Sequence, residues 1–187
     1  MERRGFLGLA LSAVGGVAGL LASIPFVKSL WPSVRARAEA EPIEVDLATL
    51  EPGQVGAYTY RGATMLVLRR TPAMLAQLDS MAEHRRDAGT VPDPAYVDVN
   101  HRAINPEYLV LRGVCPHLGC VPRLMGTAGK KIAGQWWTAG FICPCHVSGF
   151  DYTGRVVKGP APRNLSIPPH RYASPTRLII GEPTQST

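Results

Sequence analysis

The sequence predicts a mostly β domain preceded by one N-terminal transmembrane helix, and three observations lead to this class. An uncharged, largely apolar run extends from Gly5 to Val27. Several later segments alternate apolar and polar residues and are bounded by glycine or proline, which is typical of half-buried strands. All four cysteines lie in two short strings of the C-terminal half. Residues 43–187 have the length of a single domain.

The N-terminal run predicts a membrane anchor. Gly5–Val27 contains 23 residues, and a helix of that length spans about 34 Å, enough to cross the hydrocarbon core. The preceding Arg3-Arg4-Gly-Phe-Leu is similar to a twin-arginine export signal. A cleaved signal peptide is the alternative, but the run is longer than the usual apolar region. The first small-x-small site, Ala36-Arg-Ala38, lies well beyond it.

We therefore interpret residues 1–32 as an uncleaved signal anchor with its amino end in the cytoplasm. Residues 33–42 follow as a flexible hinge, because no strand pattern or helical period appears between Ser33 and Glu41. The remaining residues are expected outside the cytoplasm.

The domain begins with strand patterns. Ile43–Leu47 alternates apolar and polar residues, and Arg61-Gly62 separates two further strands. Thr71-Pro72 has the N-cap and first-turn proline of a helix, which is expected to run through Met81. The other predicted strands are Gln54–Tyr60, Ala63–Arg69, Tyr108–Arg112 and Arg177–Ile180.

The two cysteine strings are Cys115-Pro-His-Leu-Gly-Cys120 and Cys143-Pro-Cys-His-Val-Ser148. They contain the residue types of a Rieske 2Fe–2S centre, in which two Cys hold one iron and two His the other. Replacing two thiolates by imidazoles makes the oxidised centre neutral, which raises its potential from about −400 mV to between about −150 and +300 mV. If Cys115 and Cys143 bind iron, Cys120 and Cys145 remain as a pair, and a disulfide between them requires an oxidising compartment.

Two other interpretations of these cysteines stay open. A metal-free domain with two disulfides is possible in any of three pairings, but it leaves His117 and His146 without a role. A tetrahedral zinc site is the second alternative, although the C-x-C spacing of the second string fits zinc loops poorly. A c-type haem is excluded because Cys143-Pro-Cys-His146 lacks the C-x-x-C-H spacing.

On these motifs the chain resembles the Rieske iron–sulfur subunit of bacterial cytochrome bc complexes over nearly its whole length. The resemblance includes Arg3-Arg4, Pro42–Leu47, Arg69–Pro72, both cysteine strings and Gly159-Pro-Ala-Pro-Arg-Asn-Leu165, which is similar to the family's proline loop. It implies a Rieske-type antiparallel β-sandwich with a cluster-binding subdomain at about residues 111–165. It also implies one 2Fe–2S cluster and a Cys120–Cys145 disulfide.

The resemblance further implies Cys115 and Cys143 on the inner iron, His117 and His146 on the outer iron, and Ser148 beside the cluster. His146 would accept the hydrogen bond of ubiquinol on cytochrome b, so that one electron and one proton leave the quinol. The domain of residues 43–187 would then pass the electron to the c-type cytochrome subunit of a dimeric, proton-translocating quinol–cytochrome c reductase. This enzyme would operate by a Q cycle in the bacterial inner membrane, with the domain in the periplasm. Residues expected around the cluster or at the docking tip are Leu118, Gly119, Val147, Phe150 and Pro160.

Two residues depart from the family pattern. Val147 stands where the family usually has glycine, and a valine opposes positive φ and adds bulk. Phe150 stands where many members have a tyrosine whose hydroxyl bonds a ligand sulfur, so we expect a lower potential than in a Tyr-bearing relative.

Three other functions are alternatives. The small Rieske subunit of a periplasmic arsenite oxidase is favoured by Val147 and Phe150, but not by the flanking strings. A zinc-stapled exported binding module would carry no redox activity. A Rieske ferredoxin of an oxygenase would have neither the anchor nor the extra cysteine pair. The chain has a net charge of +6 but no run of five like-charged residues. We therefore expect no nucleic-acid partner.

Overall fold

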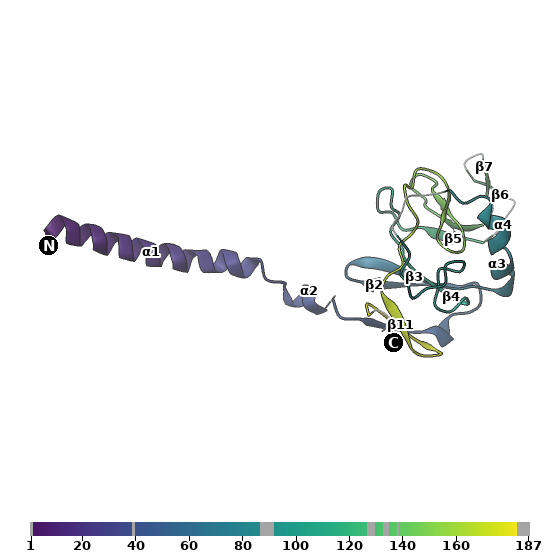
Figure 1. Cartoon of the computed structure of the whole chain (residues 1–187), viewed down its shortest axis with the longest axis horizontal. Helices are drawn as coiled ribbons and strands as arrows, with labels where there is room; N and C mark the ends of the chain where they lie inside the picture. Colours follow the sequence, from purple (N-terminus) through teal and green to yellow (C-terminus); the bar gives the residue numbers. More distant parts are fainter. Residues whose placement is uncertain are drawn as a thin grey trace. The chain divides into compact units, whose positions relative to one another are not determined.

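The computed structural model describes residues 2–38, 40–86, 92–126, 130–132, 135–137 and 139–182. The chain divides into two compact units, Met1–Glu39 and Ala40–Thr187. The first unit is helical, whereas the second is rich in β-strands (Figure 1).

The first unit contains helix α1 (Arg3–Ser29) and the short helix α2 (Val34–Ala38). α1 has 27 residues, none of them buried, and a helix of that length is about 40 Å long. Its length and apolar composition are sufficient to cross a membrane.

Helix α2 corrects the expectation of irregular chain between Ser33 and Glu41. Ser33 Oγ accepts a hydrogen bond from the backbone N–H of Ala36 at 3.1 Å, which satisfies one of the amides left unpaired at a helix start. The described side chains of α2 are exposed. Such a short helix carries no hydrophobic period by which its sequence could be identified.

The second unit is organised around an antiparallel sheet of β2 (Val55–Tyr60), β3 (Ala63–Arg69) and β4 (Tyr108–Arg112), in that order. Arg61 and Gly62 connect β2 to β3 with φ of +49° and +68°. Positive φ at both positions is the geometry of a two-residue hairpin turn. This hairpin was expected from the sequence.

Both faces of this sheet are buried, because alternate residues of a strand point to opposite sides. In β3, Met65 and Val67 pack into one hydrophobic cluster, whereas Leu66 and Leu68 pack into another. β4 divides in the same way, with Val110 facing the first cluster and Leu109 and Leu111 the second. The sheet therefore separates two cores.

The first core lies against a second antiparallel sheet, ordered β1 (Ile43–Asp46), β12 (Arg177–Ile180) and β11 (His170–Ser174). Val45, Leu178 and Ile180 enter this core. A short 3-10 turn, η1 (Leu47–Thr49), follows β1. The two sheets facing one core form the β-sandwich base of the unit.

Two short helices cover the second core. The sequence predicts one helix from Thr71 to Met81, but the structure has α3 (Pro72–Ala76) and α4 (Leu78–Ala82), separated at Gln77. The Thr71 side chain caps α3 by accepting from the backbone N–H of Met74 at 3.2 Å. The break turns Leu78 and Met81 into the core, so packing overrides the continuous helical pattern.

The second core continues into a four-stranded sheet, ordered β10 (Val156–Lys158), β9 (Gly149–Phe150), β8 (Gly140–Ile142) and β5 (Arg123–Met125). A separate hairpin pairs β6 (Lys130–Ile132) with β7 (Gln135–Trp137). In Figure 1, β5 lies above the sheet of β2, β3 and β4, and β11 lies below it. Both cysteine loops are connected to strands of the four-stranded sheet that contains β5.

Candidate metal centre

Strand pairing brings the two cysteine loops together. β4 delivers the chain to Cys115, and β5 carries it away from that loop. β8 ends at Ile142, directly before Cys143, and its hairpin partner β9 begins after Ser148. β5 pairs with the other edge of β8, with Arg123 opposite Ile142. The exit of the first loop therefore lies beside the entrance of the second.

The two loops have the same internal hydrogen bonds. In the first, the N–H of Cys115 donates to the Cys120 carbonyl at 2.8 Å, and the N–H of Gly119 donates to the Cys115 carbonyl at 2.9 Å. In the second, Cys143 donates to Ser148 at 2.8 Å. The loops are thus two copies of one turn, each starting with a cysteine.

The fifth residue of the turn has positive φ in both copies. Gly119 has φ of +87° and Val147 has φ of +58°. The second loop closes through the N–H of Val147, which donates to the Cys143 carbonyl at 3.0 Å. A β-branched residue is strained in this conformation. Val147 therefore adopts a positive φ that valine opposes, because the loop's hydrogen bonds impose this conformation on it.

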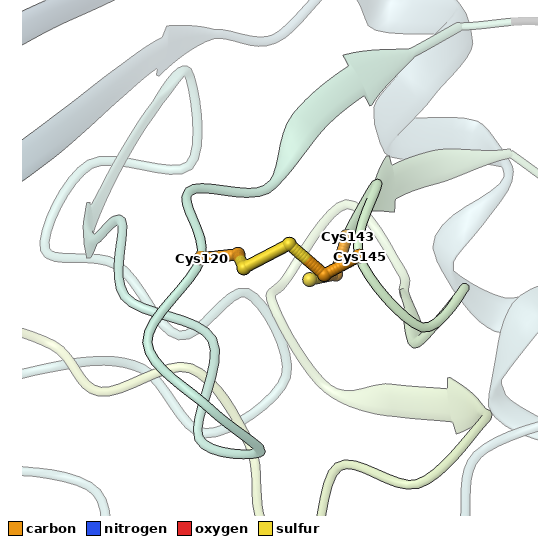
Figure 2. A group of neighbouring side chains, drawn as sticks. All are labelled: Cys120, Cys143 and Cys145. Carbon is orange, nitrogen blue, oxygen red and sulfur yellow. A yellow bond between two sulfur atoms is a disulfide. The ribbon is translucent and has the colours of Figure 1, made fainter.

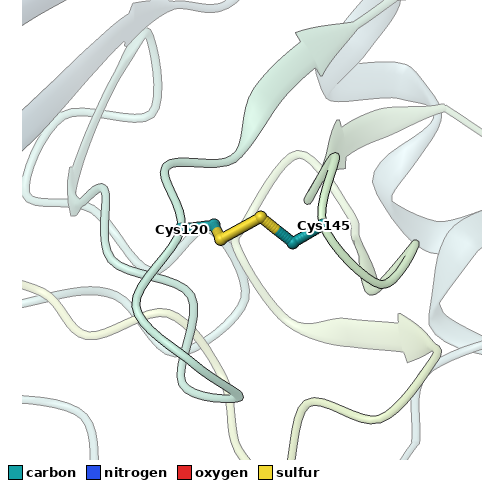
Figure 3. Close-up of a disulfide and its surroundings, with 2 residues drawn as sticks. All are labelled: Cys120 and Cys145. Atoms are coloured by element: carbon teal, nitrogen blue, oxygen red, sulfur yellow. A yellow bond between two sulfur atoms is a disulfide. The ribbon is translucent and has the colours of Figure 1, made fainter.

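The four sulfur atoms divide into a disulfide and two free thiols. Cys120 and Cys145 form a disulfide that joins the two loops, with a Cα–Cα distance of 6.6 Å (Figure 3). Cys115 and Cys143 are unpaired and only 2% exposed. The sulfurs of Cys120, Cys143 and Cys145 lie within 4.8 Å of one another (Figure 2). This trio is not itself a ligand set, because two of its sulfurs are bonded to each other, and of the three only Cys143 has a thiol free to bind metal.

The two predicted histidines also come together. The rings of His117 and His146 lie edge to face, with centroids 4.7 Å apart and planes at 85°. His146 is exposed and His117 is half-buried, in contrast to the two thiols. The neighbouring Leu118 is 69% exposed. The thiols thus lie on the inner side of the site and the imidazoles on its outer side.

Ser148 connects the inner side of the site to the proline loop. It is fully buried, and its Oγ accepts a hydrogen bond from the N–H of Ala161 at 3.1 Å. Burial raises the pKa of the Cys115 thiol, and the Cys143 thiol raises it further, whereas the His117 N–H and the Ser148 hydroxyl act in the opposite direction. Ser148 therefore interacts with the Cys115 sulfur while its position is held by the proline loop.

The proline loop presses directly on the second cysteine loop. Gly159 has φ of +87°, and a Cβ at that position would lie 2.5 Å from Ser148 Cα and 3.0 Å from the Val147 carbonyl oxygen. Arg86 donates to the carbonyl of Gly159. Pro160 itself is exposed.

A partly buried ion pair between Arg85 and Asp151 adjoins the site, and the sequence did not predict it. Asp151 is fully buried and accepts from Arg85 Nε at 2.7 Å, from Thr153 and from the N–H of Arg155. This carboxylate fixes the turn that follows Phe150, which is itself fully buried. Arg85 lies shortly after α4, and no sequence motif connects it to Asp151.

The donor set fits a 2Fe–2S cluster of the Rieske type. Such a cluster takes two thiolates on one iron and two imidazoles on the other, and two buried thiols and two outer imidazoles are grouped at one end of the unit. The disulfide removes Cys120 and Cys145 from any metal-binding set. The interpretation with two disulfides is excluded, since Cys115 and Cys143 are free.

Comparisons with known proteins agree with this cofactor. Residues 46–169 match the family described as Rieske [2Fe-2S] domain. The chain is 45% identical over 183 residues to the ubiquinol-cytochrome c reductase iron-sulfur subunit of Allochromatium vinosum, covering 96% of this chain and 88% of the relative. It is 34% identical over 179 residues to the subunit of the same name from Bradyrhizobium diazoefficiens, covering 96% and 94%.

Among solved structures, the chain is similar to one named "Hyperthermophilic respiratory Complex III", with a TM-score of 0.48 and 27% identity. The match covers 91% of this chain and 98% of that one. The family match and the two relatives together identify the cofactor as one 2Fe–2S cluster. The chain therefore belongs to the Rieske [2Fe–2S] family, among the iron–sulfur subunits of ubiquinol–cytochrome c reductase.

Proposed function

We propose that this chain takes one electron and one proton from ubiquinol and passes the electron to a c-type cytochrome. The observation that carries the proposal is the arrangement of the donors. Two thiols only 2% exposed lie beneath two imidazoles that contact each other at the outer edge of the site. Electrons can then enter and leave on the histidine side, where a partner can reach.

In this proposal Cys115 and Cys143 hold the inner iron, and His117 and His146 hold the outer one. When bound, the cluster supplies one-electron chemistry at a potential of about −150 to +300 mV. Each imidazole binds metal through one ring nitrogen and has a second nitrogen that can carry a proton.

The exposed His146 is the residue proposed to accept the quinol hydrogen bond. Leu118 and the half-buried Val147 border the imidazoles with apolar side chains. We propose that they form the surface that docks on the cytochrome b subunit. The proton then leaves through the imidazole, while the second quinol electron enters the cytochrome b haems of a Q cycle.

The helical first unit is proposed to anchor the chain. α1 is long and apolar enough to span a membrane, and Arg3-Arg4 precedes its apolar part. We propose residues 1–32 as a retained twin-arginine signal anchor in the bacterial inner membrane and residues 33–42 as the hinge. Residues 43–187 would lie in the periplasm, where a disulfide such as Cys120–Cys145 persists, and the whole subunit would belong to a dimeric complex.

Low-temperature EPR of reduced membranes, with and without the quinol-site inhibitor stigmatellin, tests the proposal. We expect a rhombic signal with an average g below the free-electron value, and a shift of that signal with the inhibitor. The signal should disappear in Cys115→Ser and in His146→Ala, and it should persist in the control His84→Ala, whose side chain is exposed. A Rieske signal that does not shift with the inhibitor would instead favour the arsenite-oxidase type of subunit.

A further inference from the structure

A cavity of about 510 Å³ lies on the side of the first cysteine loop. Its walls come from the segments Pro92–Pro94, Val114–Pro116 and Arg163–Ile167, together with the end of β4. Cavities of this size commonly hold small molecules. The proposed electron transfer does not use this cavity.

The negative charge in the cavity wall is already neutralised. Asp93 is the one acidic lining residue within the described part of the chain. Arg102 donates three hydrogen bonds to it, from Nε to both carboxylate oxygens at 2.8 Å and from Nη2 to one of them at 2.6 Å, and Arg155 Nη2 lies 3.7 Å from its other oxygen. Arg102 is only 2% exposed and also donates to the carbonyls of Thr153 and Leu165. Asp93 and Arg102 therefore contribute no net charge to the cavity.

Two further arginines in the wall lack such a partner. No hydrogen bond or ion pair of the described residues engages the side chains of Arg112 and Arg163. They come from different segments, and the backbone hydrogen bond from the N–H of Arg112 to the carbonyl of Ser166, at 2.8 Å, holds these segments together. Among the described residues, the cavity wall therefore contains two exposed arginines without a hydrogen-bonded or ionic side-chain partner.

We propose that this cavity binds a phosphate-bearing small molecule through Arg112 and Arg163. Guanidinium groups bind carboxylate and phosphate oxygens in pairs. A carboxylate has only two oxygens and one charge, which one arginine satisfies, whereas a phosphate presents enough oxygens and charge for two. Val114, Pro116 and Ile167 supply apolar wall for an organic group attached to the phosphate.

Cys115 and Gly119 of the first cysteine loop also line the cavity. A bound anion would therefore place negative charge beside a proposed iron ligand. Negative charge disfavours the reduced, more negative cluster. Occupation of the cavity should lower the reduction potential, which gives a second readout besides binding.

Binding can be measured on the full-length chain in an uncharged detergent, with no partner subunit and no quinol. Isothermal titration with inorganic phosphate and with soluble dihexanoylphosphatidic acid gives the affinities. We expect Kd to rise about tenfold for Arg112→Gln or Arg163→Gln, since each removes a charge-assisted contact. The control Arg123→Gln removes an exposed arginine that does not line the cavity, and it should leave Kd unchanged.

The two probes also separate the source of the phosphate, and either result supports the site. Tighter binding of the lipid than of inorganic phosphate assigns the apolar wall to a lipid headgroup and its chains, whereas equal affinities assign the site to free phosphate. The proposal is overturned if neither probe binds, or if the Arg123 variant weakens binding as much as the cavity variants. An EPR redox titration of the same samples should show the potential falling with phosphate in the wild type but not in Arg112→Gln. Since neither readout involves quinol, failure here leaves the proposed function untouched.

Discussion

Val147 has an unfavourable backbone conformation next to a proposed cluster ligand. Its φ of +58° matches the role of Gly119 in the first loop, where φ is +87°. An L-residue in the left-handed region loses about 1–2 kcal/mol. The loop keeps the valine there because its N–H must close the turn onto Cys143, and because Gly159 packs against the next residue.

The strain at Val147 predicts an unusual order of stability for two substitutions. Val147→Gly relieves the left-handed strain, whereas Val147→Ala retains it, so the glycine variant should be more stable by about 1 kcal/mol. Thermal unfolding of the full chain should place its midpoint about 2–4 °C higher. Val156 is buried in β10 and does not have a positive φ. At this position the alanine variant should be more stable than the glycine variant. The same order at both positions would contradict the assignment of strain to Val147.

Phe150 lacks a hydroxyl in the same buried cluster as the two free thiols. Phe150→Tyr should raise the reduction potential, because a hydrogen bond to a ligand sulfur stabilises the more negative reduced cluster. A net bond of about 0.5–1.5 kcal/mol corresponds to roughly 20–60 mV for one electron. EPR redox titration measures the shift, and Phe150→Leu, which adds no hydroxyl, should show no rise. A tyrosine variant with an unchanged potential would sink this explanation.

At the scale of elements, the contact between the proline loop and the second cysteine loop decides the geometry of the site. Gly159→Ala would bring a Cβ to 2.5 Å from Ser148 Cα. The Cβ is attached rigidly to the backbone of residue 159 and the atom it meets is a backbone atom, so neither can rotate away and one loop must move. We expect a loss of about 2–4 kcal/mol from overpacking and left-handed strain together, with a lower iron content at neutral pH.

Gly62→Ala is the matched control for this variant. Gly62 also has positive φ, +68°, but a Cβ there would meet nothing within 4 Å. It should therefore show only the strain of about 1 kcal/mol and keep its full iron content. Equal losses of stability and iron content in the two variants would show that the contact between Gly159 and the second cysteine loop adds nothing beyond the left-handed strain.

At the scale of the whole molecule, His170 makes stability depend on pH. It is 1% exposed, and burial lowers its pKa below the usual value. The neutral ring is therefore preferred in the folded state, while the unfolded chain takes up a proton near pH 6.5. Its contribution to stability is present in full above about pH 6.5 and is lost as the pH falls below that value.

Thermal unfolding between pH 7 and pH 5 checks this linkage. The midpoint of the wild type should fall more steeply than that of His170→Gln, because carboxylates contribute equally to both. His84 is exposed, so His84→Gln should follow the wild-type curve. Parallel curves for wild type and His170→Gln would exclude His170 as the source of the slope.

Several secondary-structure elements of this chain can be predicted from short stretches of its sequence. Alternation in β3 and the Arg61-Gly62 turn identify the central hairpin, because the period of two and positive φ are properties of neighbouring residues. The uncharged run identifies α1 for the same reason. The spacing within the two cysteine strings is also local, and from it we predicted two cysteines, which the structure leaves as free thiols, and two histidines, whose rings it brings into contact.

Only the tertiary structure decided how segments far apart in the chain act on one another. The support of Asp151 by Arg85 joins residues 66 positions apart, and no motif connects them. The left-handed conformation of Val147 follows from the turn in which it lies and from the packing of Gly159, against its own preference. The cavity beside Cys115 combines Arg112 and Arg163 from separate segments. Such contacts depend on the folded path of the chain, which is why the proposed donors could be predicted from the sequence, whereas the structure determined what surrounds them.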